Sequence, residues 1–169
     1  MEVFEQVVQT LLEPGEISQD VMGNTLHHIM ERGMDFADLY FQQSHHEFWS
    51  LEDGVVRDAS YDIDTGVGVR AIQGEKTGFA YSDEISASAL MQAADSARII
   101  SRGGKSGKIK VPVRTPIPHE LYASANPLAS INAEEKVALL QQLDQWARAA
   151  DPRGVQGMAS LSAAYDLVL

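Results

Sequence analysis

Residues 66–82 read GVGVRAIQGEKTGFAYS, and this stretch decides the class of fold that the sequence predicts. Apolar side chains recur at every second position on both sides of the run QGEK at 73–76, which is the period of a β-strand. A short polar run with a central glycine is typical of a turn. The stretch therefore predicts two antiparallel strands, residues 67–72 and 77–82.

The residues before this stretch extend the β pattern. Runs of period two cover residues 39–51 and 55–63, and Asp53-Gly54 between them suits the positive φ angles of a tight hairpin turn. We expect a second turn at Asp64-Thr65-Gly66. The four runs would then form an antiparallel meander with short connections.

Two helices are predicted ahead of the strands. Apolar residues repeat at helical spacing from residue 3 to residue 12, and Pro14-Gly15 ends that pattern. Ser18 is a suitable N-cap for the second helix, and Gly33 is well placed just beyond its end.

Two more helices and a returning strand follow the meander. Ser82 or Asp83 would cap the first helix, and Asn132 followed by Glu135 is typical of a capping box at the start of the second. The apolar residues expected to form the buried stripe of this last helix are Val137, Leu140, Leu143 and Ala147. Alternation from residue 158 to residue 169 predicts the final strand. The predicted fold class is α+β, with amino-terminal helices, an antiparallel β-meander with packed helices, and a returning carboxy-terminal strand.

The composition excludes several classes of function. The chain has 169 residues, no cysteine, 13 basic and 24 acidic residues, and a net charge of −11. Without cysteine there is no disulfide framework, no Cys-ligated zinc and no cysteine nucleophile. The acidity argues against direct binding of nucleic acid, because such binding relies on many Lys and Arg contacts with phosphates.

The ends of the chain and its charge distribution suggest its organisation. Glu2 and Glu5 stand where a secretory signal carries positive charge, and no run approaches the roughly 20 apolar residues that span a bilayer, so we expect a cytoplasmic protein without a membrane segment. Residues 98–114 hold six basic side chains and no acidic one, and predict a mobile basic loop at about 102–118. The apolar end, Leu-Val-Leu, suggests that residues 1–169 are a single domain, the amino-terminal part of a longer protein.

No catalytic or metal-binding constellation stands out. His27 and His28 are adjacent on a helix and point about 100° apart, which is unsuitable for chelation. His45 and Glu47 would share one face of a strand, but a zinc site needs three or four ligands. A G-x-S-x-G nucleophile motif is also missing from the sequence. We therefore predict no catalytic residue and no metal site in this chain.

The glycines of residues 66–82 suggest a binding surface instead. On a strand, Gly66, Gly68 and Arg70 share one face. A face lined with glycine lets another backbone approach closely, either a bound peptide strand or simply a helix packed across the sheet. Both interpretations stay open on spacing alone. The candidate substrate-binding residues are Gly68, Arg70, Gly78 and Tyr81.

Three segments together carry a resemblance to a known family. DLYFQ at 38–42, LEDG at 51–54 and GVGVRAIQGEKTGFAYSDEIS at 66–86 resemble the amino-terminal region of the TldD branch of the TldD/PmbA metallopeptidase family. The resemblance implies a zinc-dependent peptidase that acts on extended peptides with a PmbA-type (TldE) partner subunit. The family has also been labelled a modulator of DNA gyrase.

The family's catalytic signature is a HExxxH helix in its carboxy-terminal domain, where two His bind zinc and the Glu can act as the base. This sequence has no HExxxH, so no catalytic residue is carried over and zinc is expected only in a missing carboxy-terminal domain. We expect a non-catalytic amino-terminal domain that shapes the substrate path and the subunit interface. The alternative is an acidic regulatory module that binds a basic protein such as DNA gyrase.

Overall fold

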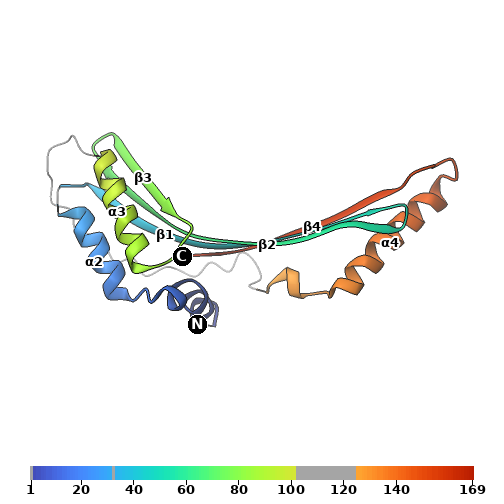
Figure 1. The fold of residues 1–169 in the computed structure, drawn as a ribbon, viewed down its shortest axis with the longest axis horizontal. Helices are drawn as coiled ribbons and strands as arrows, with labels where there is room; N and C mark the ends of the chain where they lie inside the picture. The colour runs from blue at the N-terminus through green and yellow to red at the C-terminus, as the bar shows by residue number, and fades with distance from the viewer. Residues whose placement is uncertain (1, 32, 102–124) are drawn as a thin grey trace. The chain divides into compact units, whose positions relative to one another are not determined.

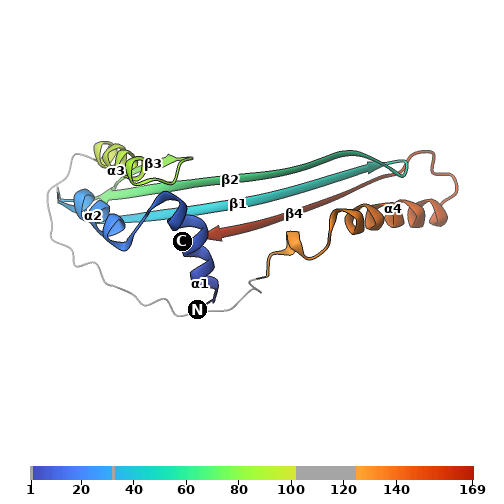
Figure 2. The ribbon, with the colours of Figure 1, turned by 60° about the horizontal axis from the view of Figure 1, so that its bottom comes forward.

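The computed structural model describes residues 2–31, 33–101 and 125–169 (Figure 1). The main elements are α1 (Glu2–Val7), α2 (Gln19–Met30), β1 (Phe36–Glu52), β2 (Val55–Gln73), β3 (Lys76–Ser82), α3 (Ala87–Ser101), α4 (Ala133–Ala150) and β4 (Met158–Val168). The strands form one sheet in the order β3-β2-β1-β4, which can be followed in Figure 2. The α+β class is confirmed, and the predicted basic loop at 102–118 lies outside the described residues.

The described residues divide into two compact units. The first holds residues up to 43, residues 64–101 and residues 167–169, and the second holds residues 44–63 and 125–166. Within the described residues, none of the helices combines the length and the apolar character needed to cross a bilayer.

The turn predicted at residues 64–66 is wrong. β2 runs without interruption from Val55 to Gln73, so the two runs predicted on either side of Gly66 are one strand. Gly54 and Gly74 have left-handed φ angles of 77° and 59°, as the two true turns require, whereas Gly66 stays in the strand. A Cβ on Gly66 would lie 2.8 Å from the carbonyl oxygen of Ser82, so this glycine permits a close approach of β3.

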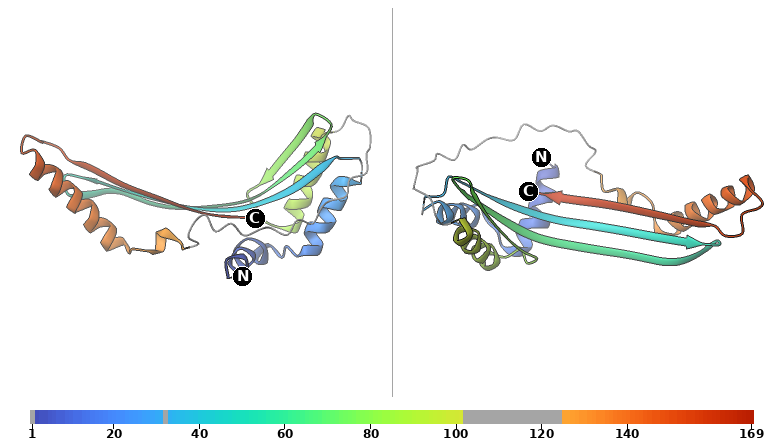
Figure 3. Two further views of the ribbon diagram at one scale, coloured as in Figure 1. Left: turned by 180° about the vertical axis from the view of Figure 1, so that it is seen from behind. Right: turned by 90° about the horizontal axis from the view of Figure 1, so that it is seen from above.

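In the first unit, α2 and α3 pack against each other and cover one face of the sheet (Figure 3). The Ser18 hydroxyl caps α2 by accepting from Val21 N at 3.2 Å, and Gly33 follows the helix with a φ of 79°, as predicted. The fully buried apolar residues of this unit include Phe41, Val67, Val69, Ala71, Leu90, Ala94 and Ala97. They form the core between α3 and the covered face of the sheet.

The start of α3 differs from the prediction. The helix begins at Ala87, and its cap is Ser86, whose hydroxyl accepts from Ala89 N at 3.2 Å. Ser82, one of the two predicted caps, instead accepts from Glu84 N at 3.1 Å in the preceding turn. Several Ser and Asp residues precede the helix, and local spacing alone did not separate the turn from the cap.

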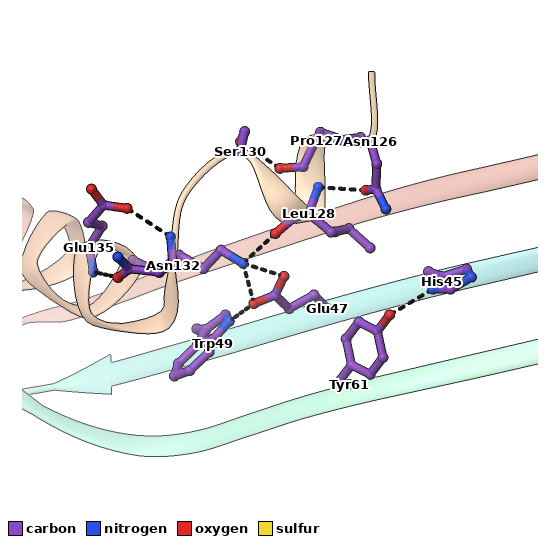
Figure 4. A network of polar contacts seen from close by, with 11 residues as sticks. His45, Glu47, Trp49, Tyr61, Asn126, Pro127, Leu128, Ser130, Asn132 and Glu135 are labelled. Atoms are coloured by element: carbon purple, nitrogen blue, oxygen red, sulfur yellow. Dashed lines mark hydrogen bonds and ion pairs between the residues drawn. The ribbon is translucent and has the colours of Figure 1, made fainter. Parts of the chain in front are cut away.

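In the second unit, α4 begins with the predicted capping box between Asn132 and Glu135 (Figure 4). Its buried positions are Lys136, Leu140 and Asp144, so the stripe predicted through Leu143 and Ala147 is wrong beyond Leu140. Two of the buried positions are polar, and each has a salt-bridge partner. The apolar side chains of Leu139, Leu143 and Trp146 are exposed as a result.

Candidate binding face

The sheet of the first unit has a second face, opposite the face that α2 and α3 cover, on which Phe36, Phe79 and Tyr81 are exposed. Gly68 and Arg70 of β2 pair with Tyr81 and Phe79 of β3, and directly paired residues of antiparallel strands project from the same face. The structure thus brings Gly68, Arg70 and Tyr81 together on this face, where Arg70 and Tyr81 are exposed and Gly68 is buried.

Arg70 forms an ion pair with Asp38 of β1 on this face. Arg70 Nε donates to Asp38 Oδ1 at 3.1 Å, and Nη2 donates to Oδ2. This paired hydrogen bonding, followed by the carboxylate charge, raises the pKa of Arg70 above its ordinary value. The guanidinium carbon also lies 5.6 Å from the centroid of the Phe36 ring. A ligand carboxylate would therefore have to compete with Asp38 for Arg70.

Four exposed aromatic side chains lie on the same face as this ion pair, and we call them the aromatic face: Phe36, Tyr40, Phe79 and Tyr81. Their exposed fractions are 46%, 44%, 55% and 79%, respectively. The Phe79 and Tyr81 rings are stacked with centroids 6.4 Å apart. Exposed apolar surface in contiguous patches is typical of binding sites. The face can therefore bind apolar side chains and the flat surface of an extended peptide.

Gly78, the fourth predicted site residue, lies on the opposite face of the sheet. It pairs with the fully buried Ala71 and is itself buried on the side that α3 covers. Sequence reasoning also missed Phe36, Asp38, Tyr40 and Phe79 as members of the site. Their signal was the shared period of two along β1 and β3, but the strand register was needed to place them beside Gly68 and Arg70.

The structure also corrects how a peptide could pair with this sheet. β2 lies between β3 and β1, so the glycine-bearing strand already has neighbouring strands on both sides. Over residues 67–73, where β2 pairs with β3, a bound peptide cannot form main-chain hydrogen bonds with it. Within the part of the chain that the structure describes, the edges of the sheet are the outer sides of β3 and β4 and of the part of β2 that precedes residue 67.

His45 and Glu47 of the second unit each have a partner other than one another. His45 Nδ1 shares a hydrogen bond of 2.7 Å with the Tyr61 hydroxyl, and Glu47 accepts from Lys136 and from the Trp49 indole (Figure 4). Burial raises the pKa of Glu47, but the Lys136 and Trp49 hydrogen bonds and the Lys136 charge lower it by more. The pKa of Glu47 is therefore below its ordinary value. Across residues 2–31, 33–101 and 125–169, no group of three His, Asp or Glu side chains could hold a metal ion.

Comparison with known proteins identifies the family. Residues 37–101, which include three of the four members of the aromatic face, match the family described as PmbA/TldA metallopeptidase domain 1. The chain belongs to the PmbA/TldD family. The metalloprotease TldD homolog of Haemophilus influenzae is 43% identical over 169 residues, which are 99% of this chain and 35% of that protein. The chain thus spans about a third of the length of this relative.

Two solved structures show the same fold. TldE from Thermococcus kodakarensis matches 88% of this chain and 34% of its own with a TM-score of 0.62 and 18% identity. A Bacteroides thetaiotaomicron protein, provisionally described as a modulator of DNA gyrase, matches 89% of this chain and 36% of its own with a TM-score of 0.59 and 15% identity. Because the sequence identities are this low, the similarity to these two structures shows the fold alone.

Proposed function

We propose that this chain is the non-catalytic amino-terminal domain of a TldD-like zinc metallopeptidase, where it shapes the substrate path and the subunit interface. The observation that carries the proposal is its 43% identity, over nearly its whole length, to a protein named as a TldD homolog of which it covers 35%. The chain itself contains no HExxxH motif. Zinc and the residues that activate water on it would belong to the remaining part of the protein.

The aromatic face supports the role in the substrate path. Phe36, Tyr40, Phe79 and Tyr81 offer flat apolar surface that contacts many side chains without selecting one. Arg70 is held by Asp38, so its charge does not impose a requirement for an acidic substrate side chain. Such a surface suits peptides of varied sequence.

The outer face of α4 supports the role in the subunit interface, with a PmbA/TldE-type subunit as the partner. Leu139, Leu143 and Trp146 follow one another at helical spacing and are 38%, 42% and 58% exposed. A shallow groove of about 610 Å³ runs beside them, lined by Ile131, Glu135, Ala138, Leu139, Gln141, Gln142 and Gln145. Interface centres are typically apolar and often contain a Trp, and this face offers two leucines and Trp146.

The second candidate function is an acidic regulatory module that binds a basic protein such as DNA gyrase. The net charge of −11 is the observation that favours it. Such a complex would weaken steeply as salt is added, because exposed charges are screened. Binding of a peptide on the aromatic face would depend less on salt, because apolar contact with exposed rings such as Phe79 and Tyr81 is not screened.

The test is peptide hydrolysis by the complete protein assembled with its partner subunit. Tyr81→Ala should lower kcat/KM for an unstructured peptide by about tenfold through lost contact area, with the zinc content unchanged. Val155→Ala, at a site 95% exposed, is the matched control and should leave turnover unchanged. Equal turnover by the Tyr81 variant and the wild type would contradict the role in the substrate path.

A further inference from the structure

β3 forms an edge of the sheet in the first unit. It pairs with β2 over seven residues in an unbroken antiparallel register, from Val67 with Ser82 to Gln73 with Lys76. In such a pair, alternate residues turn their N–H and C=O groups away from the neighbouring strand. Among the described residues, no strand pairs with the outer side of β3.

This edge has only one of the usual protections against added strands, a single lysine at its start. Proteins guard exposed edges with lysines, prolines or β-bulges. β3 reads KTGFAYS, so Lys76 is its one charged residue, it has no proline, and its register with β2 contains no bulge. Residues 77–82 therefore present neutral backbone that a further strand can join.

The side chains at this edge indicate what an added strand would carry. Phe79 and Tyr81 project from the open face, are 55% and 79% exposed, and stack on each other. Alternate side chains of an added strand would lie on that same face, beside these two rings. Apolar or aromatic residues at every second position would bury the most surface there.

The charged residues at the two ends of β3 indicate which charges a bound peptide should carry. Glu75 precedes the strand, Asp83 and Glu84 follow it, and all three are exposed. Lys76 is the one opposite charge on the strand itself. Lys or Arg near the ends of a bound segment would be attracted by these carboxylates, whereas an acidic segment would be repelled.

We propose that the outer edge of β3 binds an extended basic peptide by strand addition, with alternate apolar side chains packed on Phe79 and Tyr81. The inference rests on the proposed function in one respect, because it takes the occupant to be a substrate peptide of the complete protein. The main-chain hydrogen bonds provide affinity without sequence selection, and the two rings and the flanking carboxylates set the preferred composition.

The test uses the 169-residue chain and a fluorescein-labelled peptide, Lys-Thr-Phe-Thr-Phe-Thr-Lys, with binding followed by fluorescence anisotropy. Two further peptides carry N-methyl groups on the odd or on the even residues, which removes alternate donors and leaves the side chains in place. One methylated peptide should bind about tenfold more weakly than the parent, and the other should lose much less, because only alternate residues face β3. Equal binding of both methylated peptides and the parent, or no binding of the parent, would overturn the proposal.

Variants of the protein provide the second measurement. Tyr81→Ser should weaken binding of the parent peptide about fivefold through lost contact area, whereas Trp146→Ser, an exposed aromatic of the second unit, should not change it. Equal losses in the two variants would overturn the assignment to β3. If strand addition fails while Tyr81→Ala still impairs turnover by the complete protein, the proposed function stands and only this inference falls.

Discussion

The ring of Phe79 lies over Gly68. A Cβ on Gly68 would be 3.1 Å from Phe79 Cε2 and 3.2 Å from Cζ, so the glycine makes room for the ring. Aromatic side chains commonly cover a glycine on a neighbouring strand in this way. The space over the glycine, which the sequence suggested for a ligand, is thus occupied by the protein's own side chain, and ligand contact would be made through the ring.

Gly68→Val should therefore displace the Phe79 ring. Because the ring is 55% exposed and can turn into solvent, we expect the free energy of unfolding to change by no more than about 1 kcal/mol. Peptide turnover by the complete protein should nevertheless fall, because the stacked pair with Tyr81 is broken. Urea unfolding and a turnover assay measure the two effects. Unchanged turnover would mean that Gly68 and the ring above it have no role in the substrate path.

The ion pair between Lys136 and Glu47 gives a second prediction. Lys136 Nζ donates to the two Glu47 oxygens at 2.8 and 2.7 Å and to the Leu128 carbonyl at 3.0 Å, and both side chains are 8% exposed. Lys136→Met leaves a buried carboxylate without its counter-ion and should cost about 3–5 kcal/mol of unfolding free energy.

The matched control is the double variant Glu47→Gln with Lys136→Met. It removes both charges and keeps an acceptor for the Trp49 indole, so it should recover most of the stability lost in the single variant. Urea denaturation of wild type and both variants measures the difference. Equal losses in the single and double variants would mean that the contacts of Lys136 matter through packing and not through charge.

The sequence predicted features that are set by neighbouring residues, and failed for features that depend on residues far apart in the chain. The hairpin at Asp53-Gly54 and the capping box at Asn132 are set by neighbouring residues, and both predictions are confirmed. The burial of Lys136 depends on Glu47, which is 89 residues away, so helical periodicity assigned the buried stripe to Leu143 instead. The same difference applies to the residues of the candidate site. Period two placed Gly68 and Arg70 on one face, but only the strand register brought Phe79 and Asp38 beside them.

Acid should destabilise the protein through the same buried pair. The pKa of Glu47 is lowered in the fold, because the Lys136 and Trp49 interactions outweigh desolvation. A lowered pKa means that this contribution is complete above the pKa of the unfolded carboxyl, about 4.3, and is lost as the pH falls below it. The pKa of Asp53 is also lowered, first by the hydrogen bond from Gly157 N and then by Arg148. Protonation of Asp53 in acid should therefore also lower the stability of the fold.

The measurement is the urea midpoint from pH 7 down to pH 3. We expect little change to about pH 5 and a steep fall below it, and the fall should be shallower in Glu47→Gln, which cannot be protonated. The same slope in the variant and the wild type would assign the acid sensitivity to other carboxylates.

Two glycines of the described chain should respond in opposite ways to alanine. A Cβ on Gly157 would lie 2.0 Å from the buried Asp144 Oδ1 and 3.1 Å from Arg148 Nη2, so Gly157→Ala must move a half-buried salt bridge and should cost about 1–3 kcal/mol. Gly23 lies inside α2 with nothing within 4 Å of an added Cβ, and Gly23→Ala should gain about 0.5–1 kcal/mol. Thermal unfolding of both variants tests the pair. A loss of stability in both variants would mean that the contact with Asp144 does not explain the loss in Gly157→Ala.

Leu143→Glu on the outer face of α4 separates a role in assembly from a role in folding. The side chain is 42% exposed, so a charge there meets solvent, and we expect the free energy of unfolding to stay within about 0.5 kcal/mol of wild type. If this face meets a PmbA/TldE-type subunit, the same charge would be buried between two apolar surfaces, and the dissociation constant should rise at least about tenfold. Gln141→Glu adds the same charge on the same exposed helix beside the stripe and is the matched control. Analytical ultracentrifugation of the complete protein mixed with its partner measures both variants. An unchanged dissociation constant for Leu143→Glu would remove α4 from the interface, and an equal rise for both variants would point to charge repulsion instead of the apolar stripe.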